Sequence, residues 1–291
     1  IYPLMPSYAS MHLRSVFNLG YMPGLAVHYS TNGMYLGVSL IVIASLVIFK
    51  NAKKINLIIA FIVAIALFLT GKRALIIFPL IAILILFYLY NSNKPLSRIG
   101  KIIILLICGV IAFIIASIFI PSVSNFIYRF IETNAAGDIT LGRFEQAFLA
   151  IQQFLNNFLF GNGWDSFKYF HRRQFGVLVN VHNIYLQLLC ENGIIGALPF
   201  FVFFSVSLFR TIKVFLMLRK KMTNKYPKAE FYLGLSIGMQ CFFLLYGLTG
   251  NPLYDQQVFF PYIVCIAAGE YYVNSITKNY SYEHRYVNGG S

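Results

Sequence analysis

Seven long apolar runs separated by short polar connections constrain this chain more than any other feature. They cover residues 33–49, 55–70, 74–90, 101–120, 190–209, 229–248 and 257–273. Each has roughly 16–20 residues, close to the ~20 that a helix needs to cross a hydrocarbon core of about 30 Å. The composition is 58% hydrophobic and only 11% charged, which is too apolar for a soluble domain. The sequence therefore predicts an all-α, polytopic membrane helix bundle.

The positive charge is distributed unevenly between alternate connections. One set of connections holds 15 of the 23 Lys and Arg residues, and the other set holds 8. Because cytoplasmic loops of membrane proteins are enriched in Lys and Arg, we expect the second set to be extracytoplasmic, namely residues 1–32, 71–73, 121–182 and 249–256. Membrane orientation accounts for the net charge of +14, so no nucleic-acid partner is expected.

The chain begins at Ile1 and shows neither a signal peptide nor a cytoplasmic start. We therefore expect residues 1–291 to be a single membrane domain from the C-terminal part of a longer protein. The polar tail at 274–291 is expected to fray. The four cysteines lie in or beside apolar runs without paired spacing, which predicts packing residues and neither disulfides nor a zinc site.

The connection at 121–182 is long for a membrane protein, and long loops often carry function. Within it, apolar residues repeat at three- and four-residue steps from Phe144 to Leu159, opposite a polar face. This pattern predicts an amphipathic helix that lies flat on the outer membrane surface or on top of the bundle. Arg143 falls in its first turn, and the Gly-Asn-Gly at 161–163 ends it with residues that tolerate left-handed backbone.

Arg73 and Arg143 both stand at helix starts on the expected outer side. A cation there opposes the helix dipole, whereas a guanidinium beside helix N–H groups can hold phosphate oxygens. We favour a shared pyrophosphate site. The alternatives are a snorkelling base for Arg73, and for Arg143 a pair with Glu145 or Asp138 or a contact with anionic headgroups.

His182 is an ionisable residue at the point where a polar loop enters an apolar helix, and Asn183 can cap that helix. An imidazole with an ordinary pKa of about 6.5 can take a proton from an acceptor hydroxyl near neutral pH. The alternative is an interfacial histidine bonded to a neighbouring carbonyl. Glu191 would lie roughly 13 Å further along a continuous helix, so we expect it to have a structural role.

Other outward polar residues are weaker candidates for substrate contacts. Lys72 shares its short connection with Arg73. His28 precedes the first apolar run, which Asn32 is expected to cap. Arg172 and Arg173 lie in the long loop, where a solvated charge is the alternative. The sequence has no nucleotide-binding loop, paired metal-ligand spacing or nucleophilic-serine turn, so we predict no cofactor and no metal.

In combination, these motifs resemble the O-antigen ligase and O-antigen polymerase family over about residues 28–270. The resemblance rests on Arg73, on Gly-Arg-Phe-Glu at 142–145, on Leu-Phe-Gly-Asn-Gly at 159–163, on His-Asn-Ile-Tyr-Leu-Gln at 182–187 and on Gly-Ile-Ile-Gly at 193–196. The family often has a Trp one turn after the helix arginine, where this chain has Ala147 and Phe148.

The resemblance implies a GT-C-like glycosyltransferase in the bacterial cytoplasmic (inner) membrane, with an extracytoplasmic active site. Its donor would be an undecaprenyl-pyrophosphate-linked oligosaccharide. Arg73 and Arg143 would hold the pyrophosphate, and His182 would assist the acceptor. The lipid bilayer, a flippase and a chain-length regulator are further expected partners.

We predict a polymerase that joins repeat units into O-antigen, capsular or exopolysaccharide chains. A ligase that transfers the polymer to lipid A core or another acceptor is the alternative within the family. From other classes, a lipid-linked oligosaccharide flippase would require charged or broken helices near the membrane midplane, and a non-catalytic membrane subunit would tolerate loss of the outward Arg and His residues.

Overall fold

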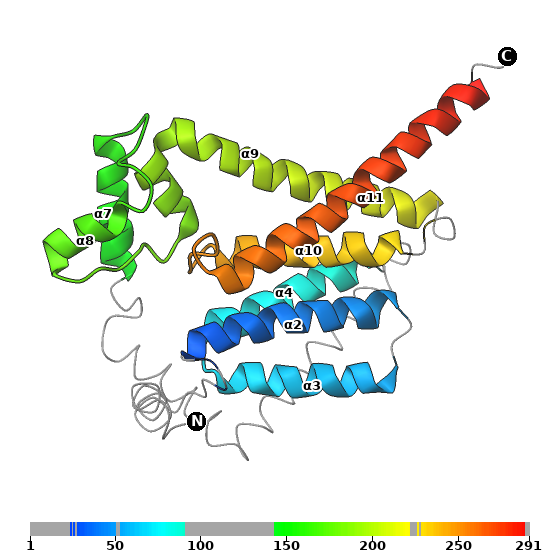
Figure 1. Cartoon of the computed structure of the whole chain (residues 1–291), viewed down its shortest axis with the longest axis horizontal. Helices are drawn as coiled ribbons and strands as arrows, with labels where there is room; N and C mark the ends of the chain where they lie inside the picture. Colours follow the sequence, from blue (N-terminus) through cyan, green and yellow to red (C-terminus); the bar gives the residue numbers. More distant parts are fainter. Residues whose placement is uncertain are drawn as a thin grey trace.

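The computed structural model describes residues 24, 26, 28–50, 53–90, 143–221, 226 and 228–288. The regular secondary structure of this part is entirely helical (Figure 1), and the predicted polytopic membrane helix bundle is confirmed. The predicted run at 101–120 and the first part of the long loop, 121–142, lie outside the described residues. The helices are α2 (Tyr29–Phe49), α3 (Lys54–Leu69), α4 (Arg73–Tyr90), α7 (Arg143–Asn156), α8 (Phe167–Phe175), α9 (Ile184–Lys221), α10 (Ala229–Tyr246) and α11 (Gln256–Asn288).

Four helices of the described part, α2, α4, α9 and α10, are long and apolar enough to cross a membrane, and α3 is a shorter apolar helix. The predicted run at 257–273 lies in α11, which is not among the four. Polar residues such as Glu270 and Asn274 lower its apolarity. The tail that was expected to fray from residue 274 belongs to α11 as far as Asn288. No Gly or Pro interrupts the chain from 270 to 288, and α11 stays helical throughout.

Helix α10 is the centre of the bundle. Of its 18 residues, 13 are buried, and it packs against α2, α4, α9 and α11. Small residues allow this close approach. A Cβ atom on Gly234 would lie 2.2 Å from the ring of Phe49, and one on Gly238 would lie 2.7 Å from the side chain of Leu86. The three described cysteines, Cys190, Cys241 and Cys265, are free and buried.

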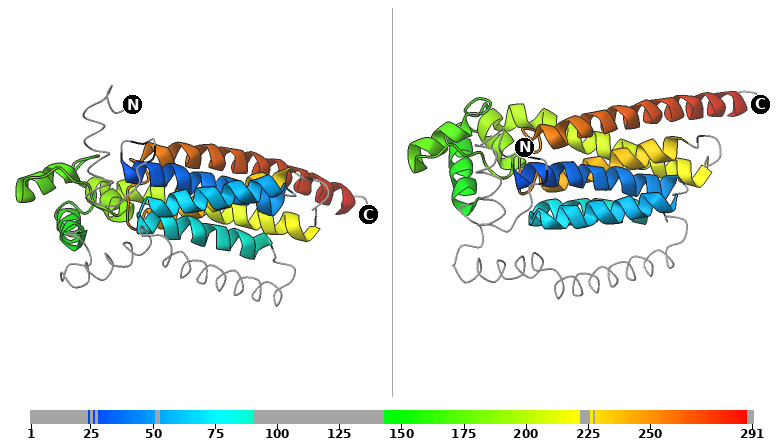
Figure 2. Two further views of the ribbon diagram at one scale, coloured as in Figure 1. Left: turned by 90° about the horizontal axis from the view of Figure 1, so that it is seen from below. Right: turned by 60° about the horizontal axis from the view of Figure 1, so that its bottom comes forward.

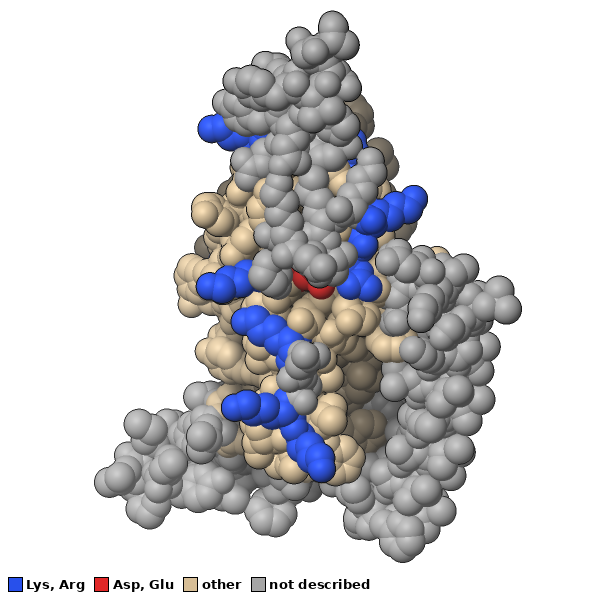
Figure 3. Space-filling model, turned by 90° about the vertical axis from the view of Figure 1, so that its right-hand side faces the viewer, with Lys and Arg blue, Asp and Glu red and all other residues tan. Residues whose placement is uncertain are grey.

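The described connections of the two sets lie at opposite ends of the bundle (Figures 1 and 2). We call the end with the starts of α2, α4, α9 and α11 the site end. Helices α7 and α8 lie beyond it, and α7 runs across the direction of the bundle helices, as predicted for an amphipathic helix on the bundle top. Lys and Arg side chains surround the other, basic end (Figure 3), and its described members include Lys50, Lys53, Lys54, Arg219, Lys220 and Lys228.

Helix α9 is broken at Gly193, whose φ of 63° and ψ of −174° belong to a backbone region open essentially to glycine alone. Residues 184–192 form a short arm and residues 194–221 form a long arm, which Figure 1 shows at a sharp bend. The predicted membrane run at 190–209 lies in α9, which is long and apolar enough to cross a membrane, but its first residues include the break, so its continuous helix begins at Ile194.

The break is completed by the segment that follows α7. In an unbroken helix, the N–H groups of Ile194 and Ile195 would bond to the carbonyls of residues 190 and 191. Here all four groups find partners in residues 158–163 instead. The bonds are Asn162 N–H to Cys190 O (3.1 Å), Gly163 N–H to Glu191 O (2.8 Å), Ile194 N–H to Phe158 O (2.9 Å) and Ile195 N–H to Leu159 O (3.2 Å).

The two backbones approach so closely that neither glycine at this contact can carry a side chain. A Cβ atom on Gly161 would lie 2.4 Å from the backbone of Glu191, and one on Gly193 would lie 2.3 Å from the carbonyl of Leu159. We call this pairing the Gly161–Gly193 contact. It joins the two glycine-containing motifs of the sequence into one structural unit.

Replacement of Gly193 by Ala should lower the melting temperature of the detergent-solubilised protein far more than replacement of Gly176. Both glycines have positive φ, but a Cβ atom on Gly176 would have nothing within 4 Å. Gly176→Ala should therefore cost only the left-handed strain of about 1–2 kcal/mol. Gly193→Ala should also disrupt the four exchanged bonds, each worth about 0.5–1.5 kcal/mol. Equal melting temperatures for the two variants would contradict the contact.

Candidate functional site

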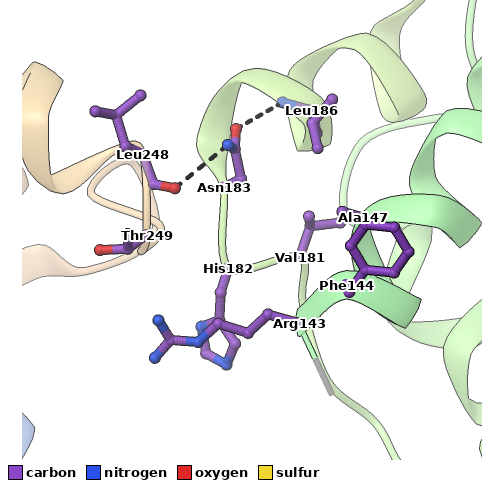
Figure 4. Close-up of a pocket in the computed structure, with 9 residues that line it drawn as sticks. All are labelled: Arg143, Phe144, Ala147, Val181, His182, Asn183, Leu186, Leu248 and Thr249. Carbon is purple, nitrogen blue, oxygen red and sulfur yellow. Dashed lines mark hydrogen bonds between the residues drawn. The ribbon is translucent and has the colours of Figure 1, made fainter. Parts of the chain in front are cut away.

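A cavity of about 230 Å³ opens at the site end of the bundle (Figure 4). Its walls come from the first turns of α7, from the segment that enters α9 and from the loop that follows α10. Much of the lining is apolar, and two basic side chains project into it. The lining residues are Arg143, Phe144, Ala147, Val181, His182, Asn183, Leu186, Leu248 and Thr249.

His182 is positioned by the start of α9. The Oδ1 atom of Asn183 accepts the backbone N–H groups of Tyr185 and Leu186, both at 3.0 Å, so the predicted cap is confirmed. The same side chain donates to the carbonyl of Leu248 at 3.3 Å, which fastens the helix start to the loop after α10. The ring of His182 has no hydrogen-bond partner among the described residues, so the carbonyl bond considered above is not found there.

Arg143 begins α7, as predicted. Its exposed side chain extends along the cavity toward His182 (Figure 4). The ion pairs of the described residues do not include one between Arg143 and Glu145. The other suggested partner, Asp138, lies outside the described residues. Arg143 thus presents its guanidinium to the cavity, beside the N-terminus of α7.

Four basic side chains form an electrostatic cluster at this end, which we call the cationic cluster: His28, Lys72, Arg143 and His182. Burial, then the charges of Arg143 and Lys72, lower the pKa of His182 to about 4. Burial and then Arg143 lower the pKa of Lys72, and burial and then Lys72 lower that of His28. The charges of Arg143 and Lys72 therefore disfavour protonation of the neighbouring groups, a penalty that a bound anion would relieve.

Lys72 and His28 meet at the ring of Tyr29. The Nζ atom of Lys72 lies 5.0 Å from the centre of that ring, and the ring of His28 has its centre 4.1 Å away. His28 also caps α2, because its Nδ1 atom accepts the N–H of Ser30 at 3.2 Å. The expectation that Asn32 caps this helix is wrong. His28 has the extended backbone that a cap requires, and α2 already begins at Tyr29.

The other predicted site residues lie less centrally. Arg73 begins α4 at the site end and is half-buried, but the charges that act on His182 are those of Arg143 and Lys72. Arg172 and Arg173 are exposed in the last turn of α8 and do not line the cavity. The structure thus brings His28, Lys72, Arg143 and His182 together, and it leaves the two α8 arginines apart from them.

Sequence reasoning did not single out the loop after α10, which supplies Leu248 and Thr249 to the cavity. The hydroxyl of Thr249 is buried without a hydrogen-bond partner in the described part of the chain. The signal was present as the polar Thr-Gly-Asn-Pro stretch at 249–252 in an outward connection. Within the described residues, no group of three His, Cys, Asp or Glu side chains could hold a metal ion.

The comparison with protein families gives a match to the O-antigen ligase family over residues 57–201, about half of the chain. A comparison with curated proteins found no match. The matched stretch holds Lys72, Arg73, Arg143 and His182, and also both glycines of the Gly161–Gly193 contact. Thus the cavity's basic groups and the contact that positions them both fall within the family's region. The chain belongs to the O-antigen ligase family, whose members are membrane-bound, glycosyltransferase-like ligases and polymerases.

Proposed function

We propose that the protein is a polymerase that joins undecaprenyl-pyrophosphate-linked oligosaccharide repeat units into O-antigen, capsular or exopolysaccharide chains. The reaction would take place at the outer face of the bacterial cytoplasmic membrane, and a flippase and a chain-length regulator would be its partners. The observation that carries this proposal is the cationic cluster beside an apolar-lined cavity at the site end.

The cluster suits a pyrophosphate because the charges of Arg143 and Lys72 disfavour protonation of their neighbours, a penalty that a bound anion would relieve. Arg143 and Lys72 would hold the phosphate oxygens, with Arg73 at the adjacent helix start contributing a further cation. The apolar lining, which includes Phe144 and Leu248, suits the part of a lipid-linked donor that lies nearest its headgroup. Stabilisation of the departing pyrophosphate is the electrostatic contribution that such groups make to transfer.

His182 would act as the general base. In the transfer, the bond between the donor's anomeric carbon and the pyrophosphate oxygen breaks, and a bond from the acceptor hydroxyl oxygen to that carbon forms. The hydroxyl proton passes to the imidazole, and undecaprenyl pyrophosphate leaves. The lowered pKa of His182 keeps the ring neutral and ready to accept a proton. The negative charge of a bound donor would then raise its proton affinity.

A ligase would use the same donor and differ only in its acceptor. We prefer a polymerase because such enzymes accompany many capsule and exopolysaccharide systems and need no outer-membrane lipid acceptor. A flippase is less well supported. The break in α9 lies at the site end, and the backbone groups that it frees are bonded to residues 158–163, so they are not open to a passing substrate.

Replacement of Arg143 or Arg73 by Ala should abolish chain extension and leave the protein in the membrane. We expect a loss of at least about 100-fold, because removal of one group that stabilises the developing charge of a leaving group typically costs that much in rate. The assay is the ladder of products made by proteoliposomes from a purified lipid-linked repeat unit. Arg210→Ala, at a side chain that bonds to Glu270 and Asn274, is the matched control and should remain active. Full activity in both test variants would refute the assignment.

The pH dependence of kcat/KM should report the lowered pKa of His182. A base with a pKa of about 4 is neutral at pH 5.5, so the rate should persist there and fall only as the pH approaches 4. Replacement of Lys72 by Met removes one of the charges that lower this pKa, so the acid limb should move upward toward the ordinary value of about 6.5. A wild-type acid limb near pH 6.5, or an unchanged limb in the variant, would contradict this role.

A further inference from the structure

Glu191 is a buried carboxylate that the proposed chemistry does not use. Its side chain is in the short arm of α9, and the residue is only 1% exposed. Its two oxygens accept four hydrogen bonds from three different segments. The donors are Asp165 N–H (2.9 Å) and Tyr254 O–H (2.7 Å) to Oε2, and Phe167 N–H (3.3 Å) and the Gln187 side-chain amide (3.0 Å) to Oε1.

The bonded segments are the ones that build the cavity. The backbone donors Asp165 and Phe167 follow α7, whose first residue is Arg143. Glu191 itself belongs to the short arm that begins two residues after His182. Tyr254 lies near the end of the loop that brings Leu248 into the cavity. Glu191 therefore ties together the elements that carry the donor-binding guanidinium, the base and the third wall.

A carboxylate is the only side chain that suits all four donors. Each oxygen accepts one backbone N–H, and these groups cannot turn away. The Tyr254 hydroxyl and the Gln187 amide can reorient, and the side-chain carbonyl oxygen of Gln187 is buried without a hydrogen-bond partner among the described residues. A glutamine at 191 would replace one oxygen by an NH₂ group, and in either orientation one backbone N–H would face a donor. Such a mismatch leaves a buried polar group unsatisfied.

We propose that Glu191 is a positioning residue, which fixes His182 relative to Arg143 by holding the loop after α7, the short arm of α9 and the loop before α11 in one arrangement. This inference rests on the proposed function, because it concerns the base and the donor-binding side chain of the transfer. It adds to that function a residue that contacts neither the lipid-linked donor nor the acceptor.

The experiment compares Glu191→Gln with Glu230→Gln in the full chain reconstituted in lipid nanodiscs. Glu230 is the matched control: a largely buried acid at the basic end, paired with Arg219 at 3.1 Å. A second pair is Tyr254→Phe, which removes one bond to Glu191, and Tyr262→Phe, which removes a buried hydroxyl that has no partner in the described part. The first readout is hydrogen exchange of the peptide that contains Asp165 and Phe167, and the second is the pH profile of kcat/KM.

Glu191→Gln should speed exchange at those two amides by about tenfold or more, because their acceptor is impaired. It should also lower kcat/KM at neutral pH by about 10- to 100-fold, since small misplacements of reacting groups have effects of that size. The acid limb should move upward, because a displaced His182 feels less of the charge of Arg143 and Lys72. Mere loss of folded protein would lower the rate equally at every pH. Tyr254→Phe should act in the same direction with a smaller effect, and both control variants should match the wild type.

Unchanged exchange in Glu191→Gln would overturn the proposed linkage. Faster exchange with a rate and a pH profile equal to those of Glu230→Gln would overturn the positioning role and leave the proposed function intact. A wild-type protein that makes no polymer from a purified lipid-linked repeat unit would overturn the proposed function and the positioning role with it. In that case the exchange measurement would still decide whether Glu191 holds the loop.

Discussion

The exchange of four backbone hydrogen bonds between the end of α7 and the break in α9 is the interaction on which the rest of the site depends. A helix break at the end of a membrane bundle frees polar backbone groups, and each such group left unpaired costs about 1–3 kcal/mol. The segment at 158–163 forms hydrogen bonds with all four of these backbone groups. The same bonds fix the position of that segment. This pairing holds α7 across the site end, so that Arg143 and His182 line one cavity although they stand far apart in the sequence.

The cationic cluster lowers the stability of the empty protein and favours the binding of an anion. Besides burial, which is the larger cause, the charge of Arg143 lowers the pKa values of Lys72 and His182, and the charge of Lys72 lowers those of His28 and His182. The arrangement is unfavourable for the empty protein, and a polyanionic ligand would reverse the penalty. Binding should then stabilise the fold through mass action. The same reversal would link donor binding to the basicity of His182, so that the base becomes competent when the leaving group is in place.

Local signals of the sequence predicted a good part of this arrangement. The lengths of the apolar runs predicted the helix bundle. Residue preferences at helix ends predicted the start of α7 at Arg143 and the cap at Asn183. These features could be predicted because they depend on nearby residues. The break at Gly193 was missed because its partner lies about thirty residues earlier, and a single glycine in an apolar run is ordinary for a membrane helix. The loop at Leu248 and Thr249 was missed for a similar reason, since only the folded bundle brings it beside His182. The early start of α2 at Tyr29 shows the limit of local cap rules, which ranked Asn32 above His28.

The most direct test of this account is a structure of the protein in lipid nanodiscs with undecaprenyl pyrophosphate, the leaving product, at saturating concentration. The account predicts that the pyrophosphate lies between Arg143 and Lys72, with its oxygens within about 3 Å of their nitrogens and with His182 beside it. A pyrophosphate bound elsewhere, with the cationic cluster left empty, would contradict the account.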